Sequence, residues 1–187
     1  MTGPPAEPVI ETERLVLRPW SEADRAAYIA LAIDPVVSTW LGGTPTTQAA
    51  EAAFEHLRGA SAAVQRQRWA LARNDDGVVV GAVSLDIVPG GRGHPLAGAV
   101  EIGWGLFPHA WGQGYASEGA AAALAWGFAN LAVDEIVSFT AASNARSEAV
   151  MRRIGLMRDA GRDFDHPDLA ADHPLRPHIV YHARRPG

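Results

Sequence analysis

The stretch Val100–Gly119, VEIGWGLFPHAWGQGYASEG, decides the fold, because it reads as a strand, a glycine loop and the start of a helix in direct succession. Side chains two apart on a strand share a face. One face of strand 100–107 is therefore expected to be open and to carry Glu101, Gly103, Gly105 and Phe107. The opposite face is expected to be packed and to carry Val100, Ile102, Trp104 and Leu106.

The two glycines of this strand have two interpretations. Glycine costs strand stability, yet it lets another chain of atoms lie directly on the backbone. A bulge or a tight twist in the sheet is the structural alternative. Beside the carboxylate of Glu101, the first interpretation predicts a ligand-binding face.

The segment Gly112–Ala116 lies between this strand and the next predicted helix. Backbone N–H groups in such a loop, together with the positive end of the helix dipole, favour an anion such as phosphate or pyrophosphate. A P-loop is excluded, because the chain contains no lysine. A dinucleotide-binding loop fits poorly, because its ribose acid should follow the next strand, whereas Asp134 precedes it.

The rest of the chain alternates between strand-like and helix-like segments. We expect strands at 11–20, 69–72, 78–88, 136–141, 156–158 and 179–183, and helices after Ser21 and at 47–64, 115–130 and 144–153. Turns are expected at 74–77, and a mobile loop at 89–98. This order predicts a mixed α/β fold with a flexible leader at 1–9 and a single domain at 10–187.

Composition excludes several classes of function. The chain of 187 residues has a formal net charge of -5, so it offers no overall positive field for nucleic acid. It has no cysteine, which excludes disulfides, thiolate metal sites and a cysteine nucleophile. The N-terminus lacks a signal-peptide pattern, and the longest apolar stretch, 119–129, is too short to span a bilayer. We therefore expect a cytoplasmic protein without a membrane partner.

Four ordered segments carry a resemblance to a known family. The segment His109–Glu118, HAWGQGYASE, resembles motif A of the GNAT acetyltransferase superfamily, in particular the branch that contains ribosomal-protein N-terminal acetyltransferases. The opening 13–20, ERLVLRPW, resembles the first strand of that branch. Asn144–Ser147 and Arg153–Leu156 resemble its two closing motifs. The resemblance implies a single GNAT-like domain, whose mostly antiparallel sheet contains one splayed parallel pair and is flanked by helices.

The resemblance also implies acetyl-coenzyme A (acetyl-CoA) as the donor. Its pyrophosphate would lie on the backbone of Gly112, Gln113, Gly114, Tyr115 and Ala116, and its pantetheine arm along Leu106 and Phe107. His109 stands where the family has Gln or Arg, which weakens any charge contribution there. Asn144 and Ser147 would contact the coenzyme, although Asn144 could equally be an ordinary helix cap. Arg146, Arg152 and Arg153 could reach the adenosine phosphate or simply be solvated.

Transfer to an amine needs a proton acceptor, an oxyanion donor and, where required, a proton for sulfur. Glu101 is the candidate base, because partial burial would raise the pKa of its carboxyl group toward neutrality; alternatively it orients the substrate or pairs with an arginine. The family's tyrosine acid falls at Met151, which has no proton to give, so Ser147 is the remaining hydroxyl. The resemblance places the oxyanion donor at a backbone N–H near Leu106.

The acceptor side is less constrained by the sequence. Trp20, Tyr28, Trp40 and Phe54 are candidate pocket walls or plain core. The tail 163–178 is rich in aspartate and histidine, but its prolines and irregular spacing favour a polar loop over a metal site, and we expect no bound metal. Asp163 or Asp165 in that loop could attract a cationic amine.

Two functions stay open at this point. The leading one is an acetyl-CoA-dependent N-acetyltransferase that acts on a protein N-terminus or a small amine, as a monomer or homodimer. The alternative is a non-catalytic acyl-CoA sensor on the same fold. With no cysteine, direct attack by the amine is favoured over a covalent acyl-enzyme.

Overall fold

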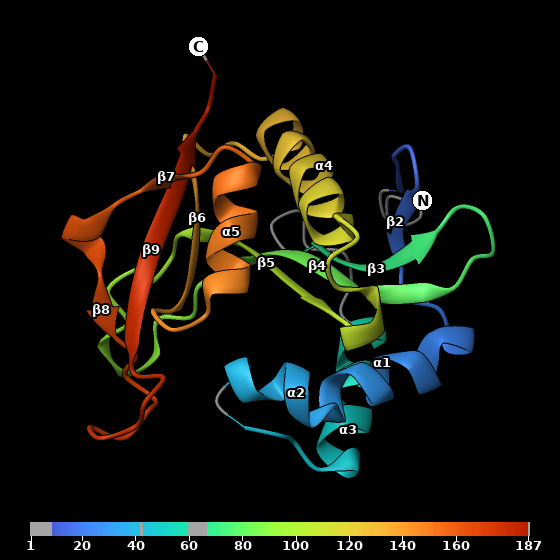
Figure 1. Ribbon diagram of the computed structural model, residues 1–187, viewed down its shortest axis with the longest axis horizontal. Helices are drawn as coiled ribbons and strands as arrows, with labels where there is room; N and C mark the ends of the chain where they lie inside the picture. The colour runs from blue at the N-terminus through green and yellow to red at the C-terminus, as the bar shows by residue number, and fades with distance from the viewer. Residues whose placement is uncertain (1–8, 42, 60–66, 187) are drawn as a thin grey trace, which may run out of the picture.

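A nine-stranded sheet runs through the computed structural model, which describes residues 9–41, 43–59 and 67–186 (Figure 1). Within that part of the chain the strand order is β1-β2-β3-β4-β5-β6-β9-β7, and β8 pairs with β9. The strands are β1 (Ile10–Glu11), β2 (Leu15–Pro19), β3 (Gln67–Arg73), β4 (Val79–Ile87), β5 (Val100–Leu106), β6 (Glu135–Ala141), β7 (Met157–Arg158), β8 (Phe164–Asp165) and β9 (Pro177–Arg184).

Helices cover both faces of the sheet. On the lower face in Figure 1 lie α1 (Arg25–Ile33), α2 (Pro35–Ser38) and α3 (Thr47–Gly59), and on the upper face lie α4 (Tyr115–Asn130) and α5 (Ala145–Arg153). Short 3₁₀ turns occur at Glu22–Asp24, Thr39–Leu41, Gly91–Gly93, Pro108–Ala110 and Ala160–Arg162. The expected fold class, a mixed sheet flanked by helices, is confirmed.

One pair of neighbouring strands is parallel, and it is the pair that opens the sheet. All seven residues of β5 pair in register with β4, from Gly81 with Leu106 to Ile87 with Val100. By contrast, β5 and β6 share a single register pair in the described chain, Glu101 with Val137. Beyond that pair the two strands separate. The expected splayed parallel pair is therefore present at β5 and β6.

The element boundaries differ from the predicted ones where side chains intervene. The strand expected at 11–20 is a hairpin of β1 and β2, because Thr12 and Leu15 bond each other at the turn: the Thr12 N–H donates to the Leu15 carbonyl at 2.8 Å. The short helix α2 was not predicted. Asp34 caps it by accepting from the N–H groups of Val36 and Val37, at 2.8 and 3.0 Å.

The loop 89–98 is more packed than its composition predicts. His94 and Leu96 are buried, and Leu96 belongs to a core cluster with Val88, Val137 and Val180. The loop therefore forms part of the wall beneath β6 rather than an open connection. The predicted leader 1–9 and the end of the helix predicted to reach 64 lie largely outside the described residues.

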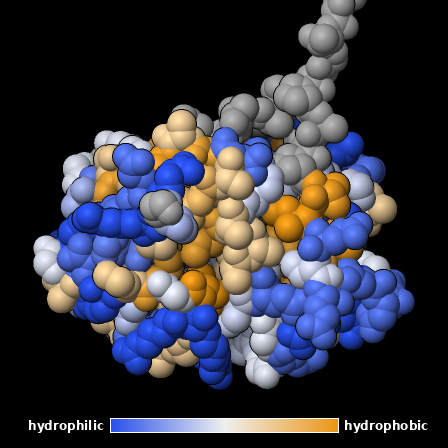
Figure 2. All heavy atoms as spheres, turned by 90° about the horizontal axis from the view of Figure 1, so that it is seen from above, coloured by the Kyte–Doolittle hydropathy of each residue, from blue (hydrophilic) through white to orange (hydrophobic). Residues whose placement is uncertain are grey.

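Helix α4 lies unusually close to the sheet. A Cβ atom built on Gly119 would lie 2.6 Å from a methyl carbon of Leu71, and one on Gly127 would lie 2.9 Å from Ile136 and Leu85. The side of the molecule that carries α4 and α5 shows a central band of hydrophobic residues between hydrophilic flanks (Figure 2). Even so, no helix in the described part of the chain is both long and apolar enough to cross a membrane.

Gly81 provides a test of the packing between β4 and β5. A Cβ at this position would lie 2.5 Å from the Gly105 carbonyl oxygen and 2.8 Å from the Leu106 Cα, so backbone must move to admit it. We expect Gly81→Ala to lower the free energy of unfolding by about 1–3 kcal/mol. Urea titration measures it.

Gly90→Ala is the matched control for that measurement. Gly90 has φ -77, which any residue adopts, and open space around it. Equal urea midpoints for the parent protein and Gly81→Ala would contradict the close contact of β4 with β5.

Candidate active site

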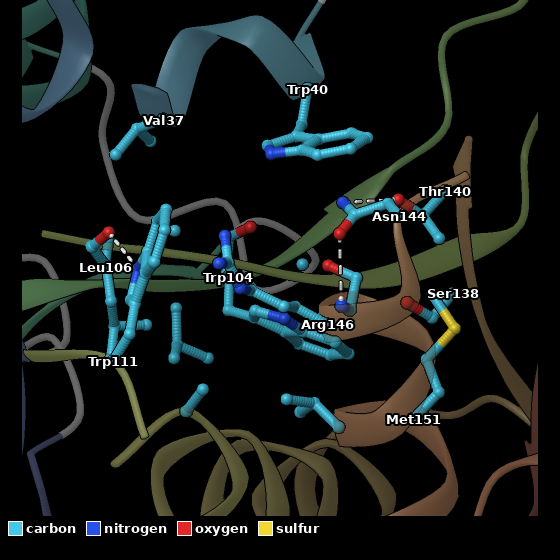
Figure 3. Close-up of a pocket in the computed structure, with 18 of the residues that line it drawn as sticks. Val37, Trp40, Trp104, Leu106, Trp111, Ser138, Thr140, Asn144, Arg146 and Met151 are labelled. Atoms are coloured by element: carbon cyan, nitrogen blue, oxygen red, sulfur yellow. Dashed lines mark hydrogen bonds between the residues drawn. The ribbon is translucent and has the colours of Figure 1, made fainter. Parts of the chain in front are cut away.

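A large cavity lies where β5 and β6 separate. Its volume is about 1220 Å³, above the roughly 300–1,000 Å³ that a pocket for one drug-sized ligand has. Helices from both faces of the sheet contribute to its walls, with Trp40 on one side and Trp104 and Arg146 on the other (Figure 3). The cavity therefore has room for two reactants that enter from different faces.

Glu101 lies in the wall of this cavity at the point where the strands part. The pKa of its carboxyl group is raised to about 8, chiefly by burial and also by the nearby carboxylate of Asp86, while the guanidinium of Arg68 acts to lower it. Asp86 is directly opposite Glu101 on β4, and its carboxylate also accepts from Arg68 Nε at 2.9 Å. A carboxyl group with this pKa exchanges protons near neutral pH.

The face of β5 around Glu101 is cleared, as its alternation predicts. The other face holds Ile102 and Leu106 in the core, where they are 0% and 5% exposed. Unbroken pairing with β4 excludes a bulge at the two glycines. A Cβ atom on Gly105 would lie 3.8 Å from Cγ1 of Val37 in α2, which is an ordinary van der Waals contact, and one on Gly103 would lie 3.4 Å from the Ser84 hydroxyl oxygen. Helix α2 therefore packs next to the cleared face of β5, beside the cavity.

The glycine loop leads into the N-terminus of α4. Gly112 and Gly114 have φ of 76 and 84, and Gly114 is the N-cap in the left-handed region that glycine adopts without strain. The first bond into the helix runs from the Glu118 N–H to the Gly114 carbonyl at 3.0 Å. The N–H groups of 115–117 precede that bond, so they have no partner within the helix. Tyr115, Ala116 and Ser117 line the cavity, which makes this end a candidate anion site.

Arg14 of the chain's N-terminal hairpin braces the loop from outside. Its guanidinium pairs with Glu118 at 2.6 Å and donates to the Gln113 carbonyl at 2.9 Å, and it lies 4.9 Å from the centre of the Tyr115 ring. The Arg14 N–H also donates to the Glu118 carboxylate at 2.8 Å. Both motifs are recognisable in the sequence, but nothing in it indicates that they are in contact, because they lie about a hundred positions apart.

Trp111 orders the edge of β5 that faces the opening. Its indole N–H donates to the Leu106 carbonyl at 2.8 Å (Figure 3), and its ring lies 4.5 Å from the guanidinium carbon of Arg146. The Phe107 N–H donates to Val80 of β4. Because amides alternate between the two edges of a strand, the Leu106 N–H points toward the opening. The sequence did not indicate this role of Trp111, although the residue lies within the glycine motif.

Asn144 and Ser147 meet at the start of α5. The Asn144 side chain is buried; it accepts from the Ser147 N–H at 3.2 Å and donates to Thr140 Oγ1 at 3.0 Å (Figure 3). Asn144 is therefore the N-cap of α5, and it ties the helix to the end of β6. Both residues line the cavity, as does Met151, which is 1% exposed.

The cavity does not include every residue predicted for coenzyme contact. Leu106, Gly112, Gly114, Tyr115 and Ala116 line it, whereas Phe107, His109 and Gln113 do not. Phe107 turns its amide to β4, and its ring stacks on His109 at 5.3 Å. The Gln113 side chain donates to the His109 carbonyl at 3.0 Å and so closes the loop on itself.

The arginines of α5 differ in their surroundings. Arg146 and Arg153 line the cavity, so both can face an anionic ligand. Arg152 does not line it, because its guanidinium pairs with Glu148 at 2.5 Å and donates to the Tyr181 hydroxyl at 3.1 Å.

Aromatic residues form the opposite end of the cavity. Trp20, Tyr28 and Trp40 line it, whereas Phe54 is fully buried in a core cluster with Trp20 and Ala70. Three of the four predicted wall residues therefore reach the cavity.

The C-terminal loop contributes to the cavity differently from the expectation. Asp163 pairs with Arg158 and accepts from the Val180 N–H at 3.1 Å, and Asp165 pairs with Arg176 at 3.3 Å. Neither residue lines the cavity, and a role for either in attracting a cationic amine stays a prediction. Asp168 and His166 line it instead. Among the described residues, no group of three or more side chains is placed to hold a metal ion.

Comparison with known proteins gives a family match across most of the chain. The acetyltransferase (GNAT) domain matches residues 14–157. A 25% identical relative, an uncharacterized N-acetyltransferase (YoaA) of Bacillus subtilis, aligns over 81% of this chain and 84% of its own. FsC-acetyl coenzyme A-N(2)-transacetylase of Aspergillus fumigatus is 32% identical, over 81% of this chain and 66% of its own.

Solved structures share the fold at lower identity. The ribosomal-protein-S5-alanine acetyltransferase of Vibrio fischeri superposes with a TM-score of 0.75 at 14% identity, over 96% of this chain and 97% of its own. The spermidine N-acetyltransferase of Vibrio cholerae, solved in complex with CoA and spermine, has a TM-score of 0.73 at 14% identity, over 93% and 97% of the two chains.

The brace by Arg14 predicts local rigidity of the glycine loop. Arg14→Met removes the charged bonds to Glu118 and Gln113, so we expect amide hydrogen exchange across 112–118 to accelerate at least about tenfold. Global stability should fall by no more than about 1 kcal/mol, because the Arg14 side chain is 45% exposed.

Arg25→Met is the control, since it removes a surface arginine that pairs with Glu22 and Glu55 far from the loop. Unchanged exchange at 112–118 in the Arg14 variant would show that the loop holds its shape without the brace.

Proposed function

The chain belongs to the GNAT acetyltransferase family and is an acetyl-CoA-dependent acetyltransferase, and on that premise we propose that it transfers the acetyl group to a primary amine by direct attack. One observation carries the proposal. Glu101 and the N-terminus of α4 lie in the walls of one cavity, at the point where β5 and β6 part. A proton acceptor and an anion site therefore face the same space.

The residues on the α4 side fit the donor. Acetyl-CoA supplies the acetyl group as an activated thioester when it is bound. The N–H groups of 115–117, together with the glycines at 112 and 114, suit its pyrophosphate. Arg146 and Arg153 add positive charge to the same wall. The indole of Trp111 keeps the edge of β5 in place beside the path of the pantetheine arm.

Glu101 is proposed as the base that takes a proton from the acceptor amine. With a pKa of about 8, Glu101 is mostly protonated at pH 7, and the deprotonated fraction that can accept a proton grows as the pH rises through 8. The strand places its carboxyl group on the cleared face, where an amine can approach from the side of α1 and α2. The new bond joins nitrogen to the acetyl carbon, and the carbon–sulfur bond breaks.

Two further groups are proposed to assist. The Leu106 N–H points into the opening and can stabilise negative charge on the acetyl oxygen. Ser147 can hydrogen-bond to the sulfur or give it a proton, since Met151, one turn further along α5, has none to give. A coenzyme thiol is fairly acidic by itself, so this assistance is expected to matter less than that of Glu101.

The acceptor is proposed to be either a protein N-terminus or a small amine. Structural neighbours include acetyltransferases of both kinds, one for a ribosomal protein and one for spermidine. The aromatic side chains of Trp20, Tyr28 and Trp40 form a largely apolar approach to Glu101.

Glu101→Gln tests the role of the carboxyl group. The amide keeps the size of the side chain but cannot take a proton, so we expect kcat to fall at least about a hundredfold while the Kd for acetyl-CoA stays the same. Thiol release with a thiol reagent measures turnover cleanly, because the chain has no cysteine. A non-catalytic acyl-CoA sensor would show no amine-dependent thiol release in the parent protein either.

The pH profile gives the same test a second readout. The base acts when deprotonated, so kcat/KM of the parent should rise with pH through about 8, and Glu101→Gln should lack that limb. Full activity of the variant with an unchanged profile would assign the proton to another group.

A further inference from the structure

The cleared face of the sheet continues from Glu101 to a cluster of histidines. Glu101 is opposite Val137 on β6, and two steps of alternation along β6 lead through Phe139 to Ala141, which is opposite His178 on β9. Directly paired residues share a face, so Glu101, Phe139 and His178 all project from the same side of the sheet. His178 and its neighbour His166 both line the cavity.

His178 offers a hydrogen-bond acceptor there. Its Nδ1 lies 3.0 Å from the Arg176 carbonyl oxygen, and a carbonyl can only accept, so Nδ1 carries the hydrogen. The lone pair is then on Nε2. Burial lowers the pKa of His178, and the neighbouring His166 and His94 lower it further, so the ring is neutral at pH 7.

His166 offers the complementary donor. Its Nδ1 accepts from the Asp168 N–H at 3.3 Å, so in this arrangement the hydrogen is on Nε2. The centres of the His166 and His178 rings lie 4.9 Å apart. Both rings line the cavity, so one N–H donor and one lone pair belong to neighbouring rings of its wall.

A frame of aromatic rings holds this pair. Phe164 stacks on His178 at 5.4 Å, and His94 packs edge-on against Phe164 at 4.8 Å and His166 at 5.7 Å. His94 accepts from the Leu96 N–H at 3.2 Å, and its Nε2 is buried without a partner among the described residues. The His94 Nε2 is therefore a buried polar atom next to the two rings that line the cavity.

We propose that His166 and His178 form a subsite for a peptide group of the acceptor, so that the acceptor is a polypeptide N-terminus bound in extended form. The proposal rests on the proposed acetyl transfer at Glu101. A peptide group has one C=O and one N–H, which match the His166 donor and the His178 lone pair; an ammonium group offers donors alone, and a carboxylate acceptors alone.

The spacing sets which peptide group is bound. Val137 and Ala141 are four residues apart on β6, which is about 13 Å along the strands, and β6 lies between β5 and β9, which adds about 10 Å across the sheet. The backbones at Glu101 and His178 are therefore about 16 Å apart, a distance that an extended peptide covers in about four to five residues. With its amine at Glu101, the acceptor therefore meets the histidine pair through a peptide group beyond its first residue.

Steady-state kinetics with acetyl-CoA and three acceptors test this subsite. The acceptors are pentaalaninamide, L-alaninamide, which is too short to reach the histidines, and hexylamine, which has no amide. The parent should prefer pentaalaninamide to L-alaninamide by kcat/KM. His178→Phe and His166→Phe keep a ring in the frame and should each lose about tenfold on pentaalaninamide, with hexylamine unchanged.

Two more variants complete the test. His173 is in the same loop and makes the same kind of turn bond, from the Leu175 N–H at 3.2 Å, but does not line the cavity; His173→Phe should leave every acceptor unchanged. His178→Gln keeps an acceptor near the position of Nε2 and should retain most of the preference for pentaalaninamide. It also covers the case in which His178→Phe does not fold.

Equal losses on pentaalaninamide and hexylamine, or no loss on either, would overturn the subsite and leave acetyl transfer standing. A parent that acetylates hexylamine but not pentaalaninamide would overturn it as well. If the parent releases no thiol with any of the three amines, the proposed function itself fails, and the subsite with it. Transfer to L-alaninamide as fast as to pentaalaninamide would assign the amide preference to free amino-acid amides instead.

Discussion

The separation of β5 from β6 is the constraint on which the rest of the structure depends. The two strands share the Glu101–Val137 pair and then diverge, which exposes one backbone edge of β5 and leaves a cavity of about 1220 Å³. Neighbouring strands in the interior of a sheet normally satisfy each other's backbone hydrogen-bonding groups. Here α4 and α5 close the gap on one face, and α1 and α2 close it on the other, so reactants from two sides can meet at that edge.

The two faces of β5 have different roles in the site. On the packed face, Ile102 and Leu106 belong to the same core cluster as residues of α4. The loop that leads into α4 carries the amides of the proposed anion site. The cleared face leaves Glu101 beside Asp86 in a poorly hydrated position, which raises the pKa of Glu101 to about 8. Placement on one strand thus brings the proposed base and the proposed donor site together. Direct transfer between them needs no covalent intermediate, which is consistent with a chain that has no cysteine.

Local patterns explain what could be predicted from the sequence. The alternation of 100–107 and the glycines at 112 and 114 depend on neighbours in the chain, so the faces of β5 and the loop before α4 followed from them. The brace of Arg14 on Glu118 and the pairing of His166 with His178 join distant segments, and no local signal indicates such contacts. For the same reason, the ion pairs of Asp163 with Arg158 and of Asp165 with Arg176 could not be predicted from the sequence.

Thermal unfolding with and without acetyl-CoA tests most directly whether the opening between β5 and β6 is the donor site. A ligand that binds the folded state at about one hundred times its Kd adds roughly 2.7 kcal/mol of stability. We therefore expect a clear rise in Tm that saturates with acetyl-CoA, and a smaller rise when Gly114 is replaced by valine, which disfavours the left-handed N-cap. No change in Tm at millimolar acetyl-CoA would contradict a donor site in this cavity.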